Sequence, residues 1–135
     1  MLRLVILLSS NSLDSLYHAL ALALSARALN WDVKVFVVSQ AAALLLRPGR
    51  RRRGLRLSVP LLARLYLRFQ MRRLRITGVE RMLEEALREG VEFHVDEVTL
   101  KLLGASREDL RDGVRLSGSV TFLTEARDSD VVLAL

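Results

Sequence analysis

Two short polar segments hold the side chains best placed to do chemistry. The first segment runs from Ser9 to Ser12, after an apolar stretch and before a helical pattern. The second centres on Asp96, which lies between another apolar stretch and another helical pattern. In α/β proteins ligands bind at such junctions, where free amides at a helix N-terminus donate hydrogen bonds. The residues predicted to bind a small ligand are Ser9, Ser10, Asn11 and Asp96.

The first segment is also consistent with a plain helix cap, because Ser12 or Asp14 can accept a hydrogen bond from the first turn. It contains no glycine, which phosphate-cradling loops need for close approach of the backbone. The sequence therefore carries no dinucleotide or P-loop signature, and no cofactor is predicted.

Asp96 has two interpretations. As the residue before a helix, it is suited to be the N-cap. Alternatively, with Glu97 and His94 it would make an acid/base group or a weak oxygen and nitrogen metal site. Strand alternation places His94 and Asp96 on one face only if the strand extends through both. The cap is favoured, so neither catalytic residues nor metal ligands are predicted.

The chain has 135 residues and no cysteine, with 51% hydrophobic and 27% charged residues. Its length predicts one globular domain, 1–135. The absence of cysteine excludes a disulfide, a thiolate metal site, a cysteine nucleophile and a persulfide within these residues. The short apolar start is a strand rather than a signal, so we expect a cytoplasmic protein. The many arginines and the low content of asparagine and glutamine indicate a thermophile.

Positive charge is concentrated in a basic insertion at about 47–76. This segment holds eleven arginines and no acid, whereas the rest of the chain has ten basic and fifteen acidic residues. Arginines and apolar residues there recur on separate helical stripes, which predicts an amphipathic helix. We favour contact of this helix with another subunit. The alternatives are that the segment 47–75 binds an anionic membrane surface or nucleic acid. The predicted contact residues are Arg64, Leu65, Arg68, Phe69 and Arg72.

Apolar runs and helical patterns alternate along the chain. Strands are predicted at 2–8, 32–38, 91–95, 115–116 and 131–135. Helices are predicted at 13–28, 40–46, 58–75, 77–90, 97–103 and 119–127, with capping-box spacing at Thr77 with Glu80 and at Ser106 with Asp109. This order predicts an α/β three-layer sandwich around a mostly parallel sheet of about five strands.

Three stretches, in order, carry a family resemblance: Leu-Val-Ile-Leu-Leu-Ser-Ser with Leu13-Asp14 and Tyr17; Leu57 with Ile76-Thr77-Gly78-Val79, Ala86 and Gly90-Val91; and Leu103-Gly104, Glu108-Asp109-Leu110, Asp112-Gly113-Val114, Gly118 and 126–132. They resemble the DsrE/DsrF-like family of small sulfur-relay proteins. The resemblance implies a Rossmann-like fold, assembly into trimers or hexamers, and sulfur transfer through a cysteine persulfide in active members.

Counting from Gly90-Val91, Asp96 stands where the resemblance places the family cysteine. A carboxylate cannot hold a sulfane sulfur, so the resemblance implies the fold without the reaction. We therefore expect a homotrimer or homohexamer with a structural or regulatory role, alongside a cysteine-bearing paralogue, or a binder of a small ligand. The alternative is a nucleic-acid or membrane-surface binder acting through the basic insertion.

Overall fold

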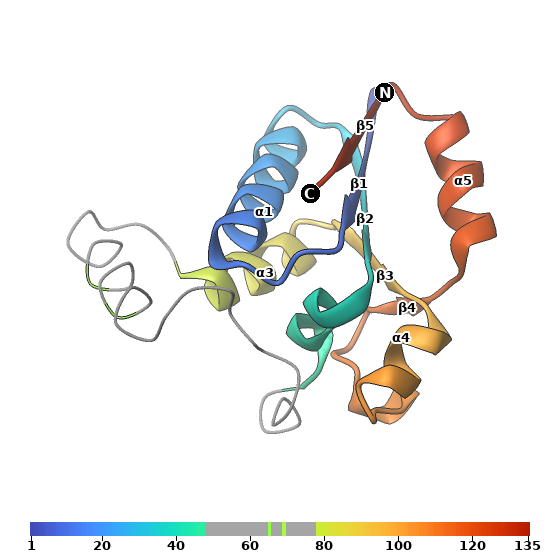
Figure 1. The fold of residues 1–135 in the computed structure, drawn as a ribbon. Coiled ribbons are helices and arrows are strands. Elements are labelled where there is room, and N and C mark those ends of the chain that lie inside the picture. Colours follow the sequence, from blue (N-terminus) through green and yellow to red (C-terminus); the bar gives the residue numbers. More distant parts are fainter. Residues whose placement is uncertain (48–64, 66–68, 70–77) are drawn as a thin grey trace.

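Five strands form one sheet in the computed structural model, which describes residues 1–47, 65, 69 and 78–135 (Figure 1). The strands are β1 (Arg3–Leu8), β2 (Asp32–Val37), β3 (Glu92–Val95), β4 (Arg115–Leu116) and β5 (Val131–Ala134). Their order across the sheet is β4-β3-β2-β1-β5, and each pair of neighbours is parallel. The predicted α/β fold is confirmed, and the sheet of these five strands is entirely parallel.

Helices lie on both faces of this sheet. They are α1 (Leu13–Ala28), α3 (Val79–Arg88), α4 (Glu97–Leu102) and α5 (Ser119–Arg127), with 3-10 segments η1 (Ser39–Leu45) and η2 (Arg107–Asp109). Figure 1 shows α1 and α3 on one face, α5 on the other, and α4 with η1 near the lower end. The described part of the chain is thus a three-layer sandwich. None of its helices is long and apolar enough to cross a membrane.

The main core fills the space between the sheet and the pair α1 and α3. Alternate residues of the strands point into it, including Ile6 of β1, Val35 of β2 and Phe93 of β3, all nearly inaccessible to solvent. Leu20 and Leu83 reach the same cluster from the two helices. β1 is largely buried on both faces and is apolar from Leu4 to Leu8, as expected for an inner parallel strand, whereas β2 and β3 include the polar residues Lys34, Glu92 and His94.

The side chain of Arg27 ties the ends of α1 and α3 together. Its Nε donates to the carbonyl oxygen of Glu89 at 2.8 Å and its Nη1 to that of Trp31 at 2.7 Å. Gly90 follows with a φ of 85°, a left-handed conformation that only glycine adopts without strain. These contacts fix the turn from α3 into β3, and hence the position of the segment that leads to Asp96.

Local structure departs from the sequence prediction at two places. The helix predicted at 40–46 is a 3-10 helix, which rises about 2.0 Å per residue instead of about 1.5 Å. The tighter coil lets these few residues span the distance from β2 to an antiparallel bridge between Leu46 and Leu110. Likewise α3 has Gly78 as its N-cap, one residue beyond the predicted Thr77, which lies outside the described residues.

Two predicted caps are confirmed. Ser12 caps α1 by accepting a hydrogen bond from the backbone N–H of Ser15 at 3.2 Å. Ser106 and Asp109 form a capping box around η2, with the Ser106 N–H donating to Asp109 Oδ2 at 3.0 Å. The helix predicted at 58–75 lies outside the described residues except for Leu65 and Phe69, which are both helical.

Replacing Phe93 by alanine should destabilise the protein by roughly 3–5 kcal/mol, because it removes a fully buried ring from the centre of the core. Urea unfolding monitored by circular dichroism measures this loss. Leu102→Ala is the matched control, since the Leu102 side chain is 79% exposed and its removal should change stability by less than about 0.5 kcal/mol. Equal losses in the two variants would contradict the described core.

Candidate functional site

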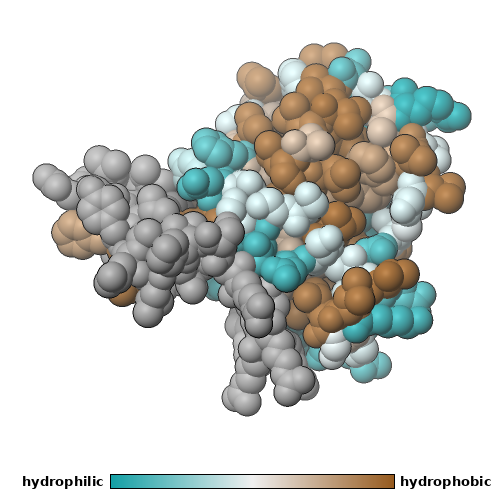
Figure 2. Space-filling view, viewed as in Figure 1, coloured by the Kyte–Doolittle hydropathy of each residue, from teal (hydrophilic) through white to brown (hydrophobic). Residues whose placement is uncertain are grey.

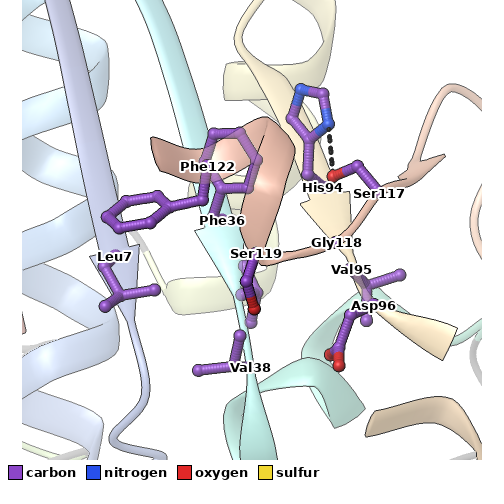
Figure 3. Close-up of a pocket in the computed structure, with 11 residues that line it drawn as sticks. Leu7, Phe36, Val38, His94, Val95, Asp96, Ser117, Gly118, Ser119 and Phe122 are labelled. Carbon is purple, nitrogen blue, oxygen red and sulfur yellow. Dashed lines mark hydrogen bonds between the residues drawn. The ribbon is translucent and has the colours of Figure 1, made fainter. Parts of the chain in front are cut away.

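A cavity of about 240 Å³ opens at the carboxyl ends of the strands, on the face that α5 covers (Figure 3). Its walls come from the ends of β1, β2 and β3 and from the turn that leads into α5. Its lining residues are Leu7, Phe36, Val37, Val38, His94, Val95, Asp96, Ser117, Gly118, Ser119 and Phe122. This is the place where open α/β sheets bind ligands.

Asp96 contributes a carboxylate to this cavity. Its backbone occupies the N-cap position of α4, with φ −92° and ψ 156°, but its side chain makes no capping hydrogen bond. Its Oδ1 is buried and has no hydrogen-bond partner in the described structure. The predicted capping role of the Asp96 side chain is therefore wrong. The carboxylate lines the cavity and does not accept a hydrogen bond from the first-turn amides of α4 (Figure 3).

The imidazole of His94 is committed to other partners. Its Nδ1 lies 3.1 Å from Ser117 Oγ and its Nε2 lies 3.3 Å from Glu92 Oε2. The ring also stacks on Phe36, with centroids 4.4 Å apart and an interplanar angle of 12°. Figure 3 shows the imidazole pointing away from the Asp96 carboxylate. No shared acid/base group of His94 and Asp96 is formed.

Glu97, the third member of that alternative, lies on the exposed side of α4. Its carboxylate faces Lys101 Nζ at 3.6 Å, one helical turn further on. Among the described residues, no group of three or more histidine, cysteine or acidic side chains is arranged to hold a metal ion.

Burial lowers the pKa of His94, and this effect outweighs the opposing influence of Glu92, whose hydrogen bond and charge favour the imidazolium. Arg115 and Lys34 add smaller contributions in the same direction as burial. The neutral imidazole is thus the favoured form, and one of its nitrogens accepts a hydrogen bond while the other donates.

An ion-pair network holds α5 over the sheet beside the cavity. Glu125 of α5 accepts from Lys34 Nζ at 2.9 Å and from Arg3 Nη1 at 3.4 Å. Arg3 Nε also pairs with Asp32 Oδ2 at 2.9 Å. One turn earlier on α5, Phe122 packs edge-on against Phe36, with ring centroids 5.3 Å apart. The position of the α5 N-terminus therefore depends on these contacts.

Ser9, Ser10 and Asn11 are not among the cavity residues, so the structure does not bring them together with Asp96. Ser9 Oγ donates to the carbonyl oxygen of Leu135 at 3.2 Å. Ser10 Oγ donates to Ser12 Oγ at 3.1 Å, and Asn11 Nδ2 donates to Gln40 Oε1 at 3.0 Å. These hydrogen bonds stabilise the turn and the end of β5.

The predicted contact residues in the basic insertion are described only at Leu65 and Phe69. Their side chains are 54% and 62% exposed. Arg64, Arg68 and Arg72 lie outside the described residues. Arg47, which begins the arginine series, pairs with Asp112 at 3.0 Å and donates to the carbonyl oxygen of Leu110 at 2.9 Å.

The sequence prediction missed the wall of the cavity that is formed by the turn into α5. Ser117, Gly118 and Ser119 follow a strand and begin a helix, which is the same signal that drew attention to the segment at 9–12. The strand before them has only two residues, so the signal is weak. Nothing in the sequence pattern identifies Phe36 and Phe122 as partners.

Comparisons with known proteins agree with this architecture. A sequence model of the DsrE/DsrF/DrsH-like family matches residues 38–134. The crystal structure of the ychN protein from E. coli is similar over 100% of both chains, with a TM-score of 0.67 and 23% identity. A protein of unknown function from Methanobacterium thermoautotrophicum, MTH1491, is similar over 98% of this chain and 99% of its own, with a TM-score of 0.59 and 17% identity. No curated protein matches significantly.

The chain belongs to the DsrE/DsrF/DrsH-like family, because the family match covers more than half of it. The structural similarities, both below 25% identity, support the fold alone. The resemblance noted in the sequence is thereby confirmed at the level of family and fold.

Folding stability should decrease as the pH falls below about 6.5, because the unfolded chain then binds a proton at His94 that the folded protein disfavours. This loss develops between the ordinary histidine pKa and the lower pKa of the folded state. Urea unfolding of wild type and His94→Gln from pH 7.5 to 5 measures it. The free energy of unfolding should depend less steeply on pH in His94→Gln than in wild type. Identical slopes in wild type and His94→Gln would contradict the assignment.

Proposed function

We propose that this protein is a non-catalytic DsrE/DsrF-like subunit with a structural or regulatory role. The observation that carries the proposal is the carboxylate of Asp96 at the position that the family resemblance gives to the persulfide cysteine. A persulfide requires a sulfur atom on the protein, and none of the 135 residues is a cysteine. The cavity beside Asp96 therefore offers a carboxylate and no sulfur-carrying group.

Assembly of several copies is the second part of the proposal, and β5 supports it. The sequence of this edge strand is entirely apolar, yet all four of its residues are exposed or half-exposed. The residues of β1 beside it are mostly buried. In the part of the chain that the structure describes, no strand pairs with the outer side of β5, and an exposed apolar edge strand of this kind favours pairing with another chain.

Further apolar surface flanks this strand. Leu22 of α1 is exposed, and Ala21 and Leu24 are half-buried on the same helix. Figure 2 shows hydrophobic residues gathered over α1 and β5 in the upper part of the molecule. We infer that a second copy covers this surface and that the assembly is a trimer or hexamer, as the family resemblance implies. A cysteine-bearing paralogue is the proposed heterologous partner.

Wild-type protein should sediment as a trimer or hexamer, and Val132→Lys should shift it towards the monomer, since a lysine on the exposed edge strand opposes strand pairing. Val132 is 46% exposed, so the substitution costs little folding stability. Leu102→Lys is the matched control on α4, and it should leave the assembly intact. Sedimentation velocity measures all three proteins. A monomeric wild-type protein would overturn the proposed assembly. If Val132→Lys formed the same oligomer as wild type, the placement of the interface on β5 would be overturned.

A further inference from the structure

We propose that the cavity beside Asp96 binds an apolar α-amino acid in its zwitterionic form. The ammonium group pairs with the Asp96 carboxylate, the carboxylate group accepts hydrogen bonds at the N-terminus of α5, and the side chain packs against Phe36 and Phe122. This inference does not depend on the assembly state, and it assigns a ligand class to a site beyond the proposed structural role.

The first requirement on the ligand comes from Asp96. Its Oδ1 is buried without a hydrogen-bond partner among the described residues, which is costly for a carboxylate unless a ligand supplies a donor. None of the described residues that line the cavity is a lysine or arginine, and the imidazole of His94 is hydrogen-bonded to Ser117 and Glu92. A positively charged donor on the ligand, such as a primary ammonium, satisfies this oxygen best.

The second requirement comes from α5. Gly118 is its N-cap, no side chain of the described residues caps it, and no acid lies in its first turn. Gly118 and Ser119 both line the cavity, and the space beside the Gly118 Cα is open. The first amides of this nine-residue helix therefore offer donors and a positive dipole end, which favour a carboxylate.

The third requirement comes from the apolar wall. Phe36 and Phe122 meet edge to face, and Leu7 extends the same wall (Figure 3). In Figure 3 Asp96 lies away from these rings, and Ser119 is drawn between the rings and Asp96. A buried apolar cavity of about 150 Å³ accommodates benzene. The 240 Å³ available here leaves room for an aromatic or branched aliphatic side chain together with its polar head.

Calorimetric titration with three compounds that share a phenylethyl skeleton tests the proposal. L-phenylalanine carries both charged groups, 2-phenylethylamine lacks the carboxylate, and 3-phenylpropionate lacks the ammonium. Phenylalanine should bind with one-to-one stoichiometry, and each of the other two at least about tenfold more weakly, because each loses one charge-assisted contact. If 2-phenylethylamine bound as tightly as phenylalanine, the role of α5 would be overturned. If 3-phenylpropionate bound as tightly as phenylalanine, the role of Asp96 would be overturned. No saturable binding of phenylalanine at millimolar concentration would overturn the site.

Three variants localise the binding. Asp96→Asn keeps the shape but removes the charge, and should weaken phenylalanine binding about tenfold or more. Ser119→Asp places a negative charge in the first turn of α5, where it repels the ligand carboxylate but favours the helix, so affinity should fall while the unfolding temperature does not. Ser9→Ala, outside the cavity, should bind as wild type does. Unchanged affinity in both Asp96→Asn and Ser119→Asp would place any binding elsewhere.

Discussion

The parallel register of β1, β2 and β3 is the constraint on which the candidate site depends. It pairs Leu7 with Phe36 and Phe36 with His94, so three side chains from distant parts of the sequence form one row across the sheet. Parallel pairing also brings the carboxyl ends of the strands to the same edge. Asp96, one residue beyond β3, and the start of α5 both reach this edge. The cavity is thus a consequence of the sheet, with α5 as its cover.

The chain has the fold of its family and contains no cysteine, and Asp96 stands at the junction of β3 and α4. A thiol at the junction of β3 and α4 would be activated by the nearby amides, since helix N-termini lower thiol pKa values. Asp96 instead places a carboxylate at this junction, and its Oδ1 is buried without a hydrogen-bond partner among the described residues. The cavity that Asp96 lines has a volume of about 240 Å³.

Elements with long apolar patterns were predictable from the sequence, and elements fixed by distant contacts were not. The strand at 3–8 and the helix at 13–28 follow directly from periodicity and from the Ser12 cap. The strand order and the pairing of Phe36 with Phe122 depend on contacts between residues far apart in sequence. Asp96 was correctly placed at the start of a helix, but its side chain faces the cavity because tertiary packing, not local capping, sets its direction.

The most direct measurement of the central claim is sulfur uptake by Asp96→Cys. In a chain without other cysteines, the new thiol is the sole acceptor, and mass spectrometry after exposure to polysulfide reports one added sulfur as a persulfide. Val98→Cys, on the exposed side of α4, is the matched control. The account predicts faster persulfide formation at position 96 than at position 98. Equal or slower uptake at position 96 would contradict its assignment as the family's reaction position.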